Sequence, residues 1–192
     1  MIPIVGVDPG LRDCGVGVVD ADTGRVLRGW LSKNPITPQS PEPNDGPAAW
    51  RAMAQTVAQE VREVLYAQGW SGQFPLLVLE RQFLPSNPAL AHSIARLIGV
   101  SGALTVTIPA HRVVDVMPAQ WKGGSTKGRA AKAKVNQEIW SAMDAEERAA
   151  APDARGKKRG HNVKDGLGIA LWAARNFAHL METGSAKGAR RA

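Results

Sequence analysis

The stretch Ile2-Pro3-Ile4-Val5-Gly6-Val7-Asp8 is an apolar run that ends on an acid. This composition predicts a buried strand, and the run Gly15-Val16-Gly17-Val18-Val19 predicts a second strand beside it. A turn signal at Asp22-Thr23-Gly24 leads into a third apolar segment over 25–31. The amino-terminal part of the chain therefore predicts an antiparallel meander of three strands.

Helix and strand patterns alternate after this meander. Apolar residues recur at helical spacing over 48–68 and 88–107, and each segment precedes a short apolar run, at 74–80 and 113–117. The run at 74–80 is apolar enough for a central strand that is covered on both faces. This order predicts an α/β fold with a mixed five-stranded sheet flanked by helices.

The last third of the chain is richer in Gly, Lys and Arg. A Gly- and Lys-rich stretch over 122–134 runs into a helix that ends near Met143, and a polar segment covers 144–160. A last helix is expected over 162–181. We expect one domain over 1–182, followed by a basic, disordered tail over 183–192.

Composition narrows the class of protein. The chain has 192 residues, of which 44% are hydrophobic, so it can form a real core. Its single cysteine, Cys14, excludes an internal disulfide and a cysteine-based zinc site. We find no secretory signal and expect no apolar run long enough to cross a membrane. These features suit a cytoplasmic protein.

The charge is uneven. The net charge is +7, and residues 122–192 hold the whole excess, because acids and bases nearly balance over 1–121. Such clustering predicts nucleic acid as the partner, against the alternative of a solvated basic surface. Glycines beside basic side chains let a backbone approach phosphates closely. The candidate phosphate contacts are Lys122, Lys127, Arg129, Lys132, Lys134, Lys157, Lys158 and Arg159.

Three acids stand at the ends of predicted elements. Asp8 and Glu80 end apolar strands, and Asp165 opens the last helix. An acid at the end of a buried strand is costly to desolvate unless a cation pairs with it, which favours a shared divalent metal. Asp8 is alternatively a turn residue before Pro-Gly, and Asp165 alternatively forms a capping box with Asn162.

Four motifs occur in an order that resembles one family. They are Val7-Asp8-Pro9-Gly10 with the run at 15–19, Leu79–Phe83 with Asn87-Pro88, Ala131–Val135, and Asp165–Ala170. Together they resemble the RuvC-type Holliday junction resolvases, bacterial or phage. The resemblance implies a ribonuclease H-like fold, a homodimer, and metal-dependent cutting of four-way DNA junctions.

The resemblance also implies roles for individual residues. Asp8, Glu80 and Asp165 would be catalytic metal ligands for Mg²⁺ or Mn²⁺, with two ions in each active site. Phe83 would contact bases at the junction, while Lys122 and Lys132 would lie near the scissile strand. The chain departs from the family at Asn162, where a fourth acidic or histidine ligand is usual.

Either Asn162 or its neighbour His161 would complete the metal site. His161 is alternatively a general base, a phosphate contact or an exposed loop residue. Arg81 would reach a phosphate or pair with an acid. Small residues on the 88–107 helix, Ser93, Gly99, Ser101 and Gly102, would permit close approach of a second copy.

Other functions fit parts of the pattern. A non-catalytic module that binds branched DNA would explain the Asn162 substitution. A ribonuclease H-like nuclease acting on other branched DNA, flaps or RNA hybrids would carry the same acids. An actin-like ATPase is disfavoured, since no second Gly-rich phosphate loop occurs. No motif identifies a helicase partner.

Overall fold

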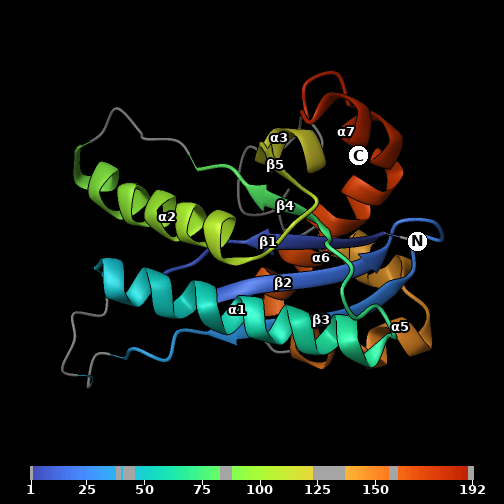
Figure 1. Ribbon diagram of the computed structural model, residues 1–192, viewed down its shortest axis with the longest axis horizontal. Coiled ribbons are helices and arrows are strands. Elements are labelled where there is room, and N and C mark those ends of the chain that lie inside the picture. The colour runs from blue at the N-terminus through green and yellow to red at the C-terminus, as the bar shows by residue number, and fades with distance from the viewer. Residues whose placement is uncertain are drawn as a thin grey trace.

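The computed structural model describes residues 2–37, 40, 46–82, 88–122, 137–155 and 160–189. Five strands form one sheet in the order β3-β2-β1-β4-β5 (Figure 1). β1 pairs antiparallel with β2 and parallel with β4, which confirms the predicted mixed sheet. The strands are β1 Pro3–Asp8, β2 Asp13–Asp20, β3 Val26–Lys33, β4 Leu76–Glu80 and β5 Arg112–Val116.

Helices cover both faces of the sheet (Figure 1). α1 (Pro47–Ala67) and α2 (Pro88–Thr107) lie on one face, over a core that includes Val5, Val7 and Leu79. α6 (Gly160–Arg175) lies on the other face, over a core that includes Ile4 and Val78. Because side chains alternate along a strand, the odd and even positions of β1 serve different cores.

The predicted final helix is two helices. α6 ends at Arg175, and α7 (Phe177–Thr183) begins after Asn176. The side-chain amide of Asn176 donates a 2.9 Å hydrogen bond to the Trp172 carbonyl, the acceptor that an unbroken helix would offer to its backbone N–H. That backbone N–H instead donates to the Ala173 carbonyl. The apolar periodicity continues through the break, so it concealed the interruption.

The segment expected to be merely polar is partly helical. It contains α5 (Ala145–Ala149) and the short 3₁₀ helix η1 (Pro152–Arg155). The side chain of Asp144 caps α5 by accepting a hydrogen bond from the backbone N–H of Glu147. The side chain of Glu147 in turn accepts a hydrogen bond from the backbone N–H of Asp144. The sequence contains this capping-box pattern, an Asp followed three residues later by a Glu, but the sequence analysis did not predict a helix from it.

The same segment lines the outer edge of β3. The carboxylate of Glu147 accepts from the backbone N–H of Val26 at 2.8 Å, and that of Asp153 accepts from Leu31 at 3.1 Å. Between them, the backbone N–H of Gly29 donates to the Ala150 carbonyl at 3.1 Å. These three donors of β3 are therefore paired within the chain.

The chain continues past α7 in contact with the core. Gly184 adopts a left-handed conformation that ends α7, and Ala186 is buried. The side-chain amide of Gln120 donates to the Ala186 carbonyl at 2.6 Å. The domain limit at residue 182 stays a prediction.

The sequence analysis expected no apolar segment long enough to cross a membrane, and α2 contradicts that expectation by its length and composition. Its window Leu90–Thr107 has the length and composition of a membrane span, the one such helix in the described ranges. Val100 and Leu104 nevertheless pack into the core with α1 and β1. A transmembrane placement would break those contacts.

Candidate active site at the ends of β1 and β4

Two of the predicted acids lie at the carboxyl ends of neighbouring strands. β1 and β4 run parallel with Val7 opposite Leu79, so Asp8 and Glu80 follow at adjacent strand ends. Alternation places both acids on the face that carries Ile4 and Val78, which is the face covered by α6. Sheet register alone therefore directs the two carboxylates toward the third acid, Asp165 of α6.

Glycines bring α6 unusually close to the sheet. A Cβ on Gly17 would lie 2.6 Å from the Cα of Leu167, and one on Gly6 would meet the backbone of Gly166. Gly15 likewise faces the backbone carbonyl of Asn162. Real Cβ atoms do not tolerate such contacts, so glycine is required on both β1 and β2. The close approach places Asp165 next to the strand ends.

A lysine ammonium lies between two of the acids. Nζ of Lys122 is 3.3 Å from Oε2 of Glu80 and 3.5 Å from Oδ2 of Asp165. The side chain of Asp165 is fully buried, and those of Glu80 and Lys122 are 12% and 5% exposed. The sequence analysis placed Lys122 near the scissile strand, and the structure places it between two predicted metal ligands.

Trp121 completes this arrangement. Its indole Nε1 donates a 3.0 Å hydrogen bond to Oε2 of Glu80, and its ring centroid is 4.2 Å from Nζ of Lys122. The ring lies against Gly168 of α6, where a Cβ would be 2.5 Å from it. Trp121 is the last residue of the short helix α3 (Pro118–Trp121), and Lys122 directly follows it. In the sequence, the only sign of this pair was that the two residues are adjacent shortly after β5.

The carboxylates are of the chemical type that binds a hard divalent ion, but the three acids are not gathered into one group of ligands. Within the described ranges, no group of three or more His, Cys, Asp or Glu side chains is close enough to hold a metal. Glu80 and Asp165 nevertheless already share a cation, the Lys122 ammonium, which acts as a stand-in ion. Asp8 is half-buried at the adjacent strand end and has interactions of its own. Carboxylate oxygens are the donors that Mg²⁺ and Mn²⁺ prefer, and two of the three predicted acids share one cation here.

Cys14 lies near this edge and takes no part as a thiolate. Burial raises the pKa of its thiol to about 12, and the charge of Asp8 adds to the rise, while a hydrogen bond from the Gly10 backbone opposes it. The thiol is fully protonated at neutral pH. It is therefore not a thiolate nucleophile there.

Solved structures of one protein share this architecture. "T. thermophilus RuvC in complex with Holliday junction substrate" matches with a TM-score of 0.58 and 22% identity, over 95% of this chain and 98% of that chain. The chain has a RuvC-like fold. A second Thermus thermophilus RuvC structure gives a TM-score of 0.55 at 22% identity, with the same coverage of 95% and 98%. No protein-family model and no curated protein matches the sequence.

In this RuvC-like fold, the two candidates for the fourth ligand lie in the first turn of α6. The helix begins at Gly160, so Asn162 is inside it and does not cap it. The capping box proposed for Asn162 and Asp165 is therefore wrong, because the helix starts before both. His161 is exposed and Asn162 is half-buried. Which of them completes the site stays a prediction.

The remaining predicted contacts are only partly visible. Arg81 is exposed, and its backbone N–H donates to the Val116 carbonyl at 2.8 Å, which ties the residue after Glu80 to β5. The other candidates lie outside the described residues. They are Phe83, Lys127, Arg129, Lys132, Lys134, Lys157, Lys158 and Arg159.

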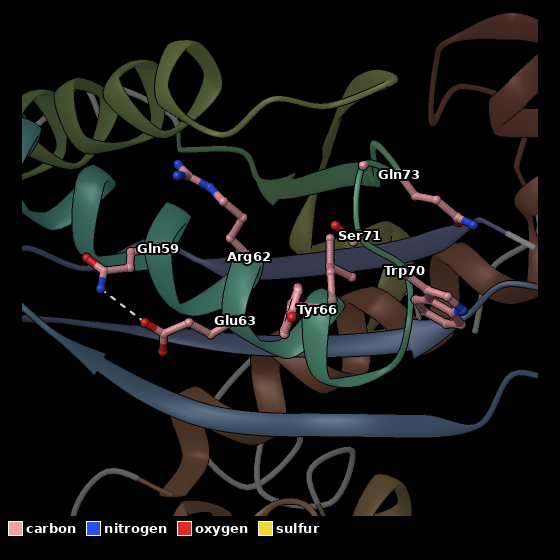
Figure 2. Close-up of a pocket in the computed structure, with 9 residues that line it drawn as sticks. Gln59, Arg62, Glu63, Tyr66, Trp70, Ser71 and Gln73 are labelled. Atoms are coloured by element: carbon pink, nitrogen blue, oxygen red, sulfur yellow. Dashed lines mark hydrogen bonds between the residues drawn. The ribbon is translucent and has the colours of Figure 1, made fainter.

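A separate pocket of about 430 Å³ lies at the other end of β4 (Figure 2). The carboxy-terminal part of α1 and the loop before β4 line it, and Gln59 donates to Glu63 at 3.0 Å beside it. β4 runs from this loop to Glu80, so the pocket is remote from the acids. Its lining includes Arg62, Tyr66, Trp70, Ser71 and Gln73.

Proposed function

We propose that this protein is a metal-dependent endonuclease that cuts four-way DNA junctions as a symmetric dimer. The observation that carries the proposal is the pair Glu80 and Asp165, which share a cation at the strand end next to Asp8. The RuvC-like fold supports it, because one of the similar structures is of RuvC with a Holliday junction substrate. The basic carboxy-terminal part of the chain supports a nucleic-acid substrate.

Asp8, Glu80 and Asp165 would hold the metal, with His161 or Asn162 as a further ligand. Mg²⁺ or Mn²⁺, two in each site, would stabilise charge on the attacking and leaving oxygens of the phosphodiester. Trp121 orients the Glu80 carboxylate through its 3.0 Å hydrogen bond. The glycine contacts beneath α6 fix Asp165 relative to the sheet.

The dimer would form through an exposed apolar ridge on α2. Leu90, Ile98 and Val106 are 56%, 40% and 84% exposed, and they lie at multiples of four residues along the helix. Ile94 is half-buried on the same ridge, and Gly102 leaves open space beside it. Ridges with this spacing pack against one another between helices. A two-fold axis here would give two active sites, as two opposed strands of a junction require.

The structure changes which small residues can serve that contact. The Trp50 ring of α1 packs on Gly99, where a Cβ would lie 2.5 Å from ring atoms. Gly99 is therefore used within the chain. Gly102 has no neighbour within 4 Å of its Cβ position among the described residues, so it remains available to a second copy.

Cleavage of a labelled synthetic four-way junction tests the function. We expect paired nicks across the junction with Mg²⁺ or Mn²⁺, none with EDTA, and little cutting of linear duplex. Asp8→Asn should abolish cutting and leave junction binding intact. Cutting that persists in Asp8→Asn contradicts the assignment of the acids, and preferential cutting of flaps or RNA hybrids would reassign the substrate.

A non-catalytic module that binds branched DNA is the second candidate. Two observations favour it: a lysine lies between two acids, and Asn162 stands where an ionisable ligand is usual. Tight junction binding without nicks in either metal would establish it. The same assay therefore separates the two candidates.

A further inference from the structure

Lys122 carries a buried positive charge. It is the one basic side chain among the buried residues of the described ranges. A buried ammonium is costly unless it is paired, and Glu80 and Asp165 provide that pairing. The face of the Trp121 indole supplies a third favourable contact at 4.2 Å. The ammonium of Lys122 is therefore a cation of the chain itself that lies between the Glu80 and Asp165 carboxylates.

The lysine contacts are loose for charged groups. At 3.3 and 3.5 Å, both are longer than the 2.7–2.9 Å typical of hydrogen bonds between an ammonium and a carboxylate. A lysine is also a compact charge on a flexible stem, unlike the planar fork of an arginine. Such an ammonium is held mainly by attraction to the pair and can leave when a stronger cation replaces it.

A divalent ion on the same oxygens cannot coexist with the ammonium at its present position. Both cations would contact Oε2 of Glu80 and Oδ2 of Asp165, and their charges would repel each other at short range. Two ligands that exclude each other lower each other's apparent affinity. The tethered lysine is always present, so it competes at a high effective concentration.

We propose that Lys122 is a tethered counter-ion of Glu80 and Asp165, and that divalent metal binds only by displacing its ammonium. Lys122 thereby sets the metal affinity of the site in the absence of DNA. The inference rests on the proposed function, because it takes Glu80 and Asp165 as metal ligands. It adds a competitor for the metal within the chain itself.

Calorimetric titration of Mn²⁺ into the full DNA-free chain tests this directly. We expect Lys122→Met to bind Mn²⁺ about tenfold more tightly than wild type, or better, because competitor and repulsion are both removed. Lys122→Arg keeps the charge and should show no tightening. Arg62→Met removes one exposed charge at the remote pocket and should match wild type. Equal or weaker binding by Lys122→Met overturns the inference.

A second measurement uses the wild type, in case the buried acids of Lys122→Met prevent folding. The rate at which acetic anhydride modifies Lys122, read by mass spectrometry, should rise at saturating Mn²⁺. An unchanged or slower rate overturns the inference. If wild type binds Mn²⁺ and cuts junctions while Lys122→Met shows no tightening, only this inference fails. If neither protein binds Mn²⁺, the metal chemistry of the proposed function fails with it.

Discussion

The indole Nε1 of Trp121 and the ammonium of Lys122 both donate to Oε2 of Glu80, at 3.0 and 3.3 Å. Two consecutive residues thus hold one oxygen of the acid that ends β4. Trp121 is almost fully buried, so its hydrogen bond restricts Glu80 to one orientation. The acid is therefore set in place before any substrate arrives.

Trp121→Phe removes this hydrogen bond while keeping an aromatic ring in the core. We expect a loss of about 1–3 kcal/mol in the free energy of unfolding, typical of a hydrogen bond to a charged group. Cutting of four-way junctions should fall by about 10- to 100-fold, as when the partner of a metal ligand is removed. Denaturant unfolding and cleavage rates check the two effects.

Trp70→Phe is the matched control, because Trp70 lines the remote pocket. Its cleavage rate should equal that of wild type. Equal rates for Trp121→Phe and wild type would show that orientation of Glu80 does not limit the reaction.

Ile98→Asp places a charge in the middle of the α2 ridge. We expect this variant to be monomeric at concentrations where wild type is dimeric, because the charge would be desolvated in the contact. Sedimentation velocity, with and without junction DNA, measures the mass. Ser141→Asp adds the same charge at an exposed position on the α6 side of the sheet and should stay dimeric. A wild type that is monomeric on DNA would exclude the dimer.

Gly17→Ala tests the close contact between β2 and α6. The new Cβ would lie 2.6 Å from the Cα of Leu167, which is backbone and cannot rotate away. We expect destabilisation of about 1–3 kcal/mol or more, from overpacking. Gly102→Ala, in open space on α2, should instead stabilise by about 0.5–1 kcal/mol. Unfolding at several protein concentrations separates this gain from any change in dimerisation.

The Cys14 thiol should make stability depend on pH in the alkaline range. Its pKa is about 12 in the folded protein and 9.0 without burial, so only the unfolded chain loses this proton between those values. Stability should therefore fall as pH rises from about 9 toward 12, by up to about 1.4 kcal/mol per pH unit. Cys14→Ala lacks this contribution, and the difference between the two pH profiles isolates it. Profiles with the same slope would contradict the raised pKa.

The sheet was predictable because β1 and β4 are apolar runs that each end on an acid, and because turn signals separate the first three strands. Asp8 and Glu80 could be placed at one edge for the same reason, since parallel neighbours end together. The break at Asn176 was not predictable from periodicity, because a side chain there competes for a helix carbonyl while the apolar spacing continues.

The candidate site was harder to predict than the sheet. Lys122 reaches the acids only because α3 follows β5 across the end of β4, a relationship of tertiary structure. Trp121 resembles any core tryptophan in sequence. His161 and Asn162 lie four and three residues before Asp165, so both share its side of α6, and helical spacing does not choose between them.

The covered edge of β3 has a consequence for how copies of this protein can associate. A bare edge strand invites another chain to extend the sheet, and repeated extension leads to fibres. Here Glu147, Ala150 and Asp153 accept the outward N–H groups of β3, so that route is closed along this strand. In the proposed two-fold contact through α2, each copy buries the same surface against the other, so that surface is not left for a third copy. Extension of the sheet along β3 should accordingly not contribute to self-association of this chain.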